Sequence, residues 1–296
     1  MAQALLRRTL FLIASSTALV AAAARAEASG PCASMPTTVR VAASDTRRSD
    51  RDTLKIASLN MAAQPRIRDA LVLWTTDRQF DVVLLQEVGD RSMDGGAFVA
   101  EVGDRLGYHV AYAPANLFGD TETQGLAILS RHPLSDVRVI PLEYHRLRFK
   151  SRCRIGLAVT VATPTGPVRV VNVHLDTRIN SKERLAQLEP LVRALALADG
   201  PRIIGGDFNT MDIRWWRTMW PFPLVEHQAA AVRTHLKEHG FQTPFPDGQP
   251  TLKFLGLPIQ LDWLYLKELD ALDWSVDDVP FSDHRGVWTR VRLRPR

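Results

Sequence analysis

The chain is poor in cysteine: its 296 residues include only Cys32 and Cys153. Two thiols are too few to form a thiolate metal site. In an oxidising compartment this pair can form one disulfide that ties the N-terminal arm to the body of the protein. Two unpaired thiols are the alternative, because the sequence does not give the distance between the two side chains.

The sequence also lacks an apolar run long enough to predict a membrane span. The apolar stretch 10–24 is too short for one. It follows the pair Arg7-Arg8 and ends in an A-x-A-like cleavage site at residues 24–26. We interpret residues 1–26 as an export signal peptide, which predicts a periplasmic or extracellular protein. An uncleaved anchor is the alternative, and the arginine pair also fits twin-arginine export.

Excess charge is scarce once this signal is set aside. The full sequence holds 37 basic and 32 acidic residues, a net charge of +5. Residues 1–26 contribute three arginines and no acid, which leaves 34 basic against 32 acidic residues, a net charge of +2. A charge this small gives only weak support for a nucleic-acid partner.

The composition is otherwise that of a soluble globular protein, with 46% hydrophobic and 23% charged residues. Residues 27–51 are rich in Ala, Ser, Thr and Arg without periodicity, which predicts a flexible leader. Residues 52–296 are long enough for one large catalytic domain and show no repeat of fixed period.

Hydrophobic periodicity divides this domain into helices and strands. Helical spacing of apolar residues predicts helices at 66–77, 96–107, 181–200 and 227–239. Short apolar runs predict strands at 54–59, 82–86, 125–130, 155–161, 168–174, 203–206, 261–266, 274–276 and 286–292. Strands with helices between them suit sheets flanked by helices, so the fold class is α/β or α+β.

Side chains able to bind a hard metal or transfer protons stand at the ends of apolar strand-like runs six times. A carboxylate in that position is costly in a core unless it is paired or metal-bound, whereas a strand end that opens onto a cleft accounts for it. The segments are IASLNMA (56–62), VVLLQEV (82–88), VVNVHLD (170–176), RIIGGDFNT (202–210), QLDWLYL (260–266) and FSDHRGVW (281–288). Together they predict one site made of Asn60, Glu87, His174, Asp207, Asn209, Asp262, Asp283 and His284.

Four of these motifs, taken in order, resemble the metal-dependent endonuclease/exonuclease/phosphatase superfamily: QE at 86–87, NVHLD at 172–176, GGDFN at 205–209 and SDH at 282–284. The resemblance covers about residues 52–293. It implies a four-layer α/β/β/α sandwich with two packed mixed sheets, and a site at one edge where loops of both sheets meet. His174 stands where the apurinic-endonuclease branch has a tyrosine, so the deoxyribonuclease, sphingomyelinase and phosphatase branches are favoured.

The resemblance implies a hard divalent ion, for which Mg²⁺ is the first expectation and Mn²⁺ or Ca²⁺ are the alternatives. Glu87 is the expected primary metal ligand. Asn60 would complete or orient the metal shell through its amide, and Asp283 would join that shell.

The same resemblance assigns the catalytic roles. Asp207 would orient or deprotonate the attacking water, and Asn209 would donate to a phosphoryl oxygen. These two residues would point the same way if the chain were extended there. His284 would contact the phosphate and transfer a proton, since an unperturbed pKa near 6.5 suits neutral pH. Asp262 would hold the His284 ring, and His174 would work from the opposite side.

Two segments suggest how a substrate would be bound. The basic residues at every second position of HRLRFKSRCR (145–154) would line one face of a strand, which places Arg152 or Arg154 near a phosphate. A solvated basic sheet edge is the alternative. The segment WWRTMWPFP (215–223) has three tryptophans that would stack bases, enter a lipid interface or pack in the core.

The sequence thus predicts an exported, monomeric, divalent-metal-dependent phosphoesterase whose favoured substrate is a nucleic acid, cleaved endonucleolytically. A phospholipid or sphingomyelin phosphodiesterase acting at a lipid surface is the nearest alternative, and an inositol-phosphate phosphatase is the next. A non-catalytic binding module that retains the fold is disfavoured, because every expected catalytic position is filled.

Overall fold

The computed structural model describes residues 32, 38–40, 52–64, 67–118, 121–147, 151–197, 199–216, 220–222, 225–253 and 259–293. The chain divides into two units, Met1–Ser34 and Met35–Arg296, and the second holds every labelled helix and strand. The predicted signal peptide and most of the predicted leader lie outside the described residues. Cys32 and Cys153 are both disulfide-bonded, which removes the alternative of two unpaired thiols.

The larger of two sheets has seven strands in the order β1-β4-β5-β3-β2-β14-β13. Only β2 and β3 are parallel neighbours, so the sheet is mixed. Its strands are β1 (Thr38–Arg40), β2 (Thr53–Asn60), β3 (Val82–Val88), β4 (His109–Phe118), β5 (Glu122–Ser130), β13 (Asp270–Asp277) and β14 (Gly286–Arg292).

The smaller sheet has five strands in the order β12-β9-β8-β7-β6 and again contains one parallel pair, β8 and β9. Its strands are β6 (Leu134–Pro141), β7 (Ile155–Thr163), β8 (Gly166–His174), β9 (Arg202–Asp207) and β12 (Asp262–Lys267). A separate antiparallel hairpin consists of β10 (Arg214–Trp216) and β11 (Trp220–Phe222).

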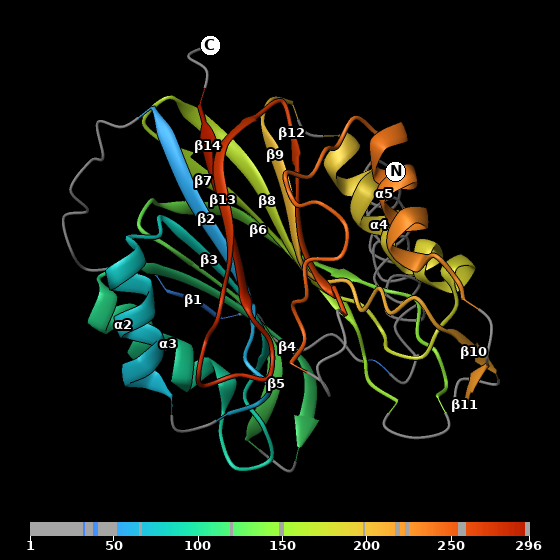
Figure 1. The fold of residues 1–296 in the computed structure, drawn as a ribbon. Helices are drawn as coiled ribbons and strands as arrows, with labels where there is room; N and C mark the ends of the chain where they lie inside the picture. The colour runs from blue at the N-terminus through green and yellow to red at the C-terminus, as the bar shows by residue number, and fades with distance from the viewer. Residues whose placement is uncertain are drawn as a thin grey trace, which may run out of the picture. The chain divides into compact units, whose positions relative to one another are not determined.

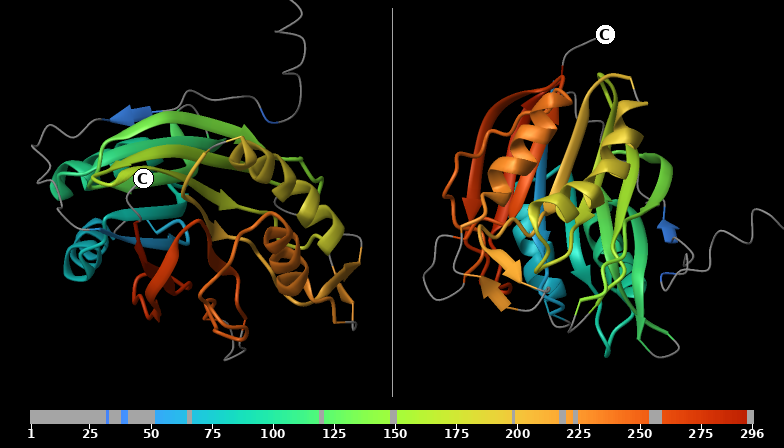
Figure 2. Two further views of the ribbon diagram at one scale, coloured as in Figure 1. Left: turned by 90° about the horizontal axis from the view of Figure 1, so that it is seen from above. Right: turned by 90° about the vertical axis from the view of Figure 1, so that its right-hand side faces the viewer.

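Helices cover the outer faces of both sheets. The helices α2 (Arg68–Arg78) and α3 (Gly95–Leu106) pack on the seven-stranded sheet, and α4 (Ser181–Ala196) and α5 (Gln228–Glu238) pack on the five-stranded sheet. Figure 1 shows the two helix pairs on opposite sides of the sheets, and Figure 2 shows the same layers from two further directions. The predicted four-layer α/β/β/α sandwich with two mixed sheets is confirmed.

The alternating direction of the side chains along β3 explains how one apolar strand packs into two hydrophobic cores. Val82 and Leu84 pack into the core shared with the five-stranded sheet, whereas Val83 and Leu85 pack toward α2 and α3. Successive strand side chains point to opposite faces, and both faces of this strand are covered. The strand therefore has an unbroken apolar sequence in place of a polar and apolar alternation.

Both parallel strand pairs end at the same edge of the sandwich. Asn60 at the end of β2 pairs with Gln86 in β3, and His174 at the end of β8 pairs with Asp207 at the end of β9. The antiparallel strand β12 begins at this edge, with Asp262 opposite Asp207. Polar residues that follow apolar runs are thereby collected outside the carboxyl ends of the parallel strands, where open α/β sheets bind ligands.

A buried amide pair joins the two sheets beneath that edge. Gln86 Nε2 donates to Asn172 Oδ1 at 2.7 Å and to Ser58 Oγ at 3.1 Å. Asn172 Nδ2 donates to the carbonyl oxygens of Leu85 and Ala127 at 2.8 and 2.9 Å. Because both amides are fully buried, these hydrogen bonds favour one placement of the sheets relative to each other.

Five strands were not predicted from the sequence: β1, β4, β6 and the two short strands of the β10–β11 hairpin. β4 contains Pro114 and a bulge that follows it, and β6 has mostly half-exposed or exposed side chains, so neither has a uniform apolar run. β1 pairs with β4 but lies within residues 27–51, the segment predicted to be a flexible leader. The leader prediction therefore does not hold at residues 38–40.

The basic segment 145–154 differs from its prediction. Its described residues, 145–147 and 151–154, belong to no strand and precede β7 as irregular chain. The expectation that its basic side chains share one strand face is therefore wrong, and each arginine has to be considered by itself.

Within the described ranges, no helix combines the length and the apolar character that crossing a bilayer requires. The apolar stretch 10–24 lies outside those ranges.

Gly206 offers a test of how tightly the end of β9 is packed. Its φ is +144°, and a Cβ there would meet the carbonyl oxygen of Val173 at 1.9 Å. Gly166 has a φ of +132° but nothing within 4 Å of such a Cβ. We expect Gly166→Ala to lower the free energy of unfolding by about 1–3 kcal/mol. Gly206→Ala should lower it by more, because β8 must also move. Chemical denaturation measures both, and equal losses would contradict this explanation.

Candidate active site

Three ionisable residues of the five-stranded sheet lie side by side at the shared edge. Strand pairing places His174 opposite Asp207, and Asp207 opposite Asp262. Their exposed fractions are only 5%, 1% and 0%. Burying three such groups together is costly unless they share a proton, pair with one another or hold an ion.

Asn60 and Glu87 reach the same place from the seven-stranded sheet. Asn60 Nδ2 donates to Asp207 Oδ2 at 2.9 Å and to Glu87 Oε1 at 3.4 Å. His174 Nε2 lies 3.5 Å from Asp207 Oδ2 and 3.9 Å from Glu87 Oε1. One carboxylate from each sheet therefore faces the same amide and the same imidazole.

Glu87 is aimed at the site by a distorted backbone. Its φ is +53°, and the pairing of β3 with β5 shifts register between Leu85 and Val88. A bulge of this kind redirects a side chain, and such strain persists only where the surroundings hold it in place. The Glu87 side chain remains 32% exposed, so the site is open to solvent at this carboxylate.

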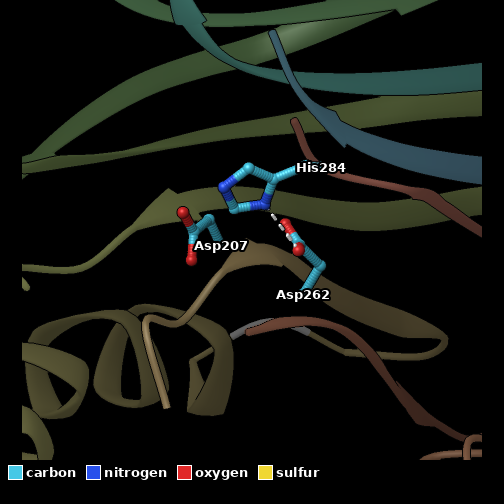
Figure 3. A group of neighbouring side chains, drawn as sticks. All are labelled: Asp207, Asp262 and His284. Carbon is cyan, nitrogen blue, oxygen red and sulfur yellow. Dashed lines mark hydrogen bonds and ion pairs between the residues drawn. The ribbon is translucent and has the colours of Figure 1, made fainter. Parts of the chain in front are cut away.

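His284 and Asp262 form an ion pair beside Asp207, as Figure 3 shows, with 2.8 Å between Nδ1 and Oδ2. Burial by itself lowers the pKa of His284, but the carboxylates of Asp262, Asp207 and Asp283 outweigh it and raise the pKa to about 10. His284 is therefore a cation at neutral pH. The sequence led us to expect an ordinary pKa, because Asp262 and Asp207 are distant from His284 in the chain.

The loop that carries His284 is fastened to the end of β2. Ser282 Oγ donates to the carbonyl oxygen of Asn60 at 2.6 Å and accepts from the His284 backbone N–H at 3.0 Å. This connection uses neither the imidazole nor the Asn60 amide. Both functional side chains therefore remain directed into the site.

Asp207 is a carboxyl group whose pKa lies near neutral pH. Burial raises its pKa to about 7, and the neighbouring Asp262 charge adds to that effect. His284, Asn60 and the backbone N–H of Asn209, which donates to Oδ1 at 2.8 Å, act in the opposite direction by favouring the ionised form. A carboxylate with such a pKa can accept a proton from water, as a general base must.

Asn209 does not continue the extended chain of β9. Its φ is +50°, and its Nδ2 donates to the carbonyl oxygen of Leu175 at 2.9 Å. The expectation that Asp207 and Asn209 point the same way along a strand is therefore wrong, because β9 ends at Asp207 and the chain turns. In this position Asn209 supplies a backbone donor to Asp207 and ties the loop after β9 to the loop after β8.

His174 has the opposite charge state to His284. Burial lowers its pKa well below the usual range, and the positive charges of Arg154 and His284 lower it further. His174 is therefore neutral at neutral pH. Since β8 and β12 flank β9, a neutral imidazole and the Asp262–His284 pair lie on the two sides of Asp207.

Arg154 is held at the site by a buried carboxylate. Its Nε donates to Asp176 Oδ1 at 2.9 Å, and Asp176 Oδ2 accepts from Gln187 Nε2 at 2.8 Å. Arg154 lines one pocket together with Glu87 and His174. A guanidinium held through Nε keeps its terminal N–H groups for a phosphate.

The other basic residues of segment 145–154 are less well placed. Arg152 is half-buried and lies close enough to Glu87 for that charge to affect its pKa. Arg146 is exposed, and residues 148 and 150 lie outside the described part of the chain.

The site contains groups that fit a divalent ion. Asp207, Asp262 and His284 each offer a ligand atom within 4.8 Å of the others. His284, however, is protonated and bonded to Asp262, so the partly exposed Glu87 carboxylate is the better ligand. Asn60 Nδ2 donates to the carboxylates of Glu87 and Asp207, and Asp262 Oδ1 is a buried acceptor without a hydrogen bond. Oxygen donors of this kind suit Mg²⁺.

Asp283, the third expected metal ligand, lies apart from these groups. Its side chain is exposed, and it is not among the three residues whose ligand atoms converge. Its backbone carbonyl oxygen accepts from the N–H of Lys253 at 2.8 Å. Asp283 acts on the site at most through its charge, which contributes to the raised pKa of His284.

Arg184 was not assigned from the sequence. It is fully buried and donates to the carbonyl oxygens of Asp176, Ile179 and Phe208 and to Gln228 Oε1. These bonds tie the loop after β8 to the loop after β9, and burial lowers its pKa to about 10. The sequence did contain a signal that Arg184 is buried. Residues 184, 187, 188 and 191 share one face of α4, so Arg184 and Gln187 interrupt an otherwise apolar stripe.

The aromatic segment 215–223 lies in the β10–β11 hairpin and its connection. Residues 217–219 and 223 lie outside the described ranges. Trp215 is half-buried, and its backbone N–H donates to Asn180 Oδ1 at 3.0 Å. The role of the tryptophans stays a prediction.

The model of the endonuclease/exonuclease/phosphatase family matches residues 41–284. The chain belongs to this family. The resemblance inferred from its motifs is thereby confirmed, and with it the general class of hydrolytic phosphoesterases. No curated protein sequence matches the chain.

Solved structures extend the agreement to the fold. An endonuclease/exonuclease/phosphatase from Beutenbergia cavernae has a TM-score of 0.65 and 21% identity, over 82% of this chain and 72% of that one. A family protein from Leptotrichia buccalis has a TM-score of 0.62 and 17% identity, over 80% and 98% of the two chains. ANGEL2, described as a 2′,3′-cyclic phosphatase, has a TM-score of 0.59 and 17% identity, over 81% and 95%.

The Asp262–His284 pair should make stability depend on pH. Folding raises the His284 pKa from 6.5 to about 10, so the folded protein binds the extra proton. The pair's contribution is complete below pH 6.5, declines as the pH rises toward 10 and is lost above that. We expect the unfolding temperature of protein in EDTA to fall across this window, and to fall less in Asp262→Asn. Parallel pH profiles for the two proteins would refute the assignment.

Proposed function

We propose that the protein is a divalent-metal-dependent phosphoesterase that hydrolyses phosphodiester bonds. The observation that carries this proposal is the position of Asp207 between a neutral His174 and the cationic His284. Phosphoester hydrolysis needs an activated water, stabilised phosphoryl oxygens and assistance to the leaving group. These three residues match those needs in kind and in charge.

Four side chains of the site have distinct roles in the proposed reaction. Asp207 accepts the proton of the attacking water, because its pKa lies near neutrality. His284, held through Nδ1 by Asp262, places a fixed positive charge against the phosphoryl oxygens. Arg154, held by Asp176, binds the same phosphate from the His174 side. His174, being neutral, donates a hydrogen bond to a phosphoryl oxygen, and the cationic His284 supplies the proton that the leaving oxygen takes up.

Glu87, with Asn60 through its amide, would hold the ion, and we propose Mg²⁺. When bound, the ion neutralises charge on the phosphate. Asp262 and His284 keep their ion pair in this arrangement.

A nucleic acid cleaved internally is the favoured substrate. Arg152 and Arg154 both lie near Glu87, which suits a polyanion, whereas the cationic head of a choline lipid would be repelled. ANGEL2, one of the structural neighbours, is described as acting on 2′,3′-cyclic phosphates. We further propose, from residues 1–26, that the protein is exported, and that it acts as a monomer.

A phospholipid or sphingomyelin phosphodiesterase is the second candidate. It is favoured by the export signal and by the tryptophans of segment 215–223, since tryptophan is enriched at membrane interfaces. A lipid substrate would use the same Asp207 and His284 and would differ only in what binds the rest of the molecule.

Supercoiled plasmid separates these candidates. We expect the purified protein with Mg²⁺ to convert plasmid to nicked circles, and we expect no nicking in EDTA or with His284→Ala. Intact plasmid together with hydrolysis of sphingomyelin vesicles would establish the second candidate instead. Hydrolysis of neither substrate by folded protein would contradict the proposed reaction.

Substitutions separate catalysis from stability. Asp207→Asn and His284→Gln should lower kcat by roughly 10²–10⁴-fold, as loss of a general base or of a preorganised charge does. Asp212→Asn and His227→Gln are matched controls, because both side chains are exposed. Thermal unfolding of all four variants is measured in parallel. Activity losses that follow the unfolding temperature, or that occur equally in the controls, would make the two site residues structural.

A further inference from the structure

Two arginines and a phenylalanine from three different connections form a cluster beside the active site. Arg91 comes from the loop between β3 and α3, Phe118 ends β4, and Arg152 precedes β7. The guanidinium carbons of Arg91 and Arg152 lie over the Phe118 ring, 5.2 and 5.0 Å from its centroid. Contacts of this kind between a cation and an aromatic face are attractive. We call these three residues the Arg–Phe cluster.

The Arg–Phe cluster adjoins the groups that would act on a phosphate. The charges of Arg91, Arg154 and Glu87 all reach Arg152 strongly enough to affect its pKa, after burial. Arg154, two residues further on, lines the pocket that contains Glu87 and His174. Positive charge therefore continues from the pocket outward through Arg152 to Arg91.

The backbone between Arg152 and Arg154 is held in place by the Asn116 side chain. The Cys153 N–H donates to Asn116 Oδ1 at 3.0 Å, and Asn116 Nδ2 donates back to the Cys153 carbonyl oxygen at 3.3 Å. Asn116 and Phe118 are two residues apart in β4 and so share a face of that strand. The same strand thus anchors the segment carrying Arg152 and provides the ring on which its guanidinium lies.

Among the described residues, neither guanidinium group of the Arg–Phe cluster forms an ion pair with a carboxylate, and Glu87 acts on Arg152 only through its charge. Like charges held together in this way repel each other, and a bound anion would relieve the repulsion. A guanidinium that lies over an aromatic ring keeps N–H donors available in its plane, in the geometry that binds phosphate. The cluster therefore has the chemistry of a phosphate site with its donors still free.

We propose that Arg91, Phe118 and Arg152 form a subsite for a second phosphate, one that neighbours the hydrolysed phosphate in a single nucleic-acid strand. This proposal rests on the proposed phosphodiesterase function and specifies its substrate as a chain of phosphates. A polynucleotide supplies such a phosphate, whereas a choline phospholipid would bring a cation toward the same arginines.

Two substrates of different length test the subsite: a single-stranded oligonucleotide and bis(p-nitrophenyl) phosphate, which has one phosphate. We expect Arg91→Gln and Phe118→Leu each to lower the ratio of kcat/KM for the oligonucleotide to kcat/KM for the small diester by roughly 10-fold, mainly through KM. The salt dependence of oligonucleotide binding should weaken by about 0.7 in slope for a lost phosphate contact. Arg193→Gln, an exposed arginine on α4, removes the same charge elsewhere and should leave the ratio unchanged.

The conservative variants Arg91→Lys and Phe118→Tyr should recover part of the ratio, which a folding defect would not explain. Hydrolysis of both substrates with one ratio in all variants would overturn the subsite and leave the proposed function standing. A wild-type protein that hydrolyses only the small diester would likewise overturn it. Hydrolysis of neither substrate would instead count against the proposed function itself.

Discussion

The buried hydrogen bond between Gln86 and Asn172 is the interaction on which the rest of the site depends. It joins β3 to β8 one residue before Glu87 and two residues before His174. Apolar faces alone pack without strong directional preference, but buried amides are costly to leave without partners. This bond therefore selects the placement of the sheets in which Glu87 and His174 face the same space.

Within that space Asp207, Asp262 and His284 depend on one another because all three are almost fully buried. Burial, together with the neighbouring charge of Asp262, raises the Asp207 pKa, and the same two carboxylates keep His284 protonated. Arg184 adds a buried positive charge beneath the two loops, through bonds to backbone oxygens. Perturbed ionisation of this kind is costly for stability, and it also supplies the base and the cation that the proposed reaction requires.

Much of the fold could be predicted because its signals are local. Apolar runs that end in a polar residue predicted β2, β3, β8 and β9, and helical spacing predicted α3 and α4. β4 was missed because Pro114 and a bulge interrupt its pattern, and β6 because its side chains are mostly not buried. Arg184 was missed because most of its partners are backbone carbonyls of distant loops, which a sequence pattern does not reveal.

By itself the sequence determined most of the side chains that gather at the site, Asp283 excepted, since each stands at one end of an apolar run and periodicity is a property of neighbouring residues. Only the tertiary structure decided their states. His174 is neutral because it is buried and lies near Arg154 and His284, whereas His284 is cationic because the carboxylates of Asp262 and Asp207 outweigh its burial. The turn at Asn209 and the Arg–Phe cluster were likewise decided by contacts between segments that are distant in the chain.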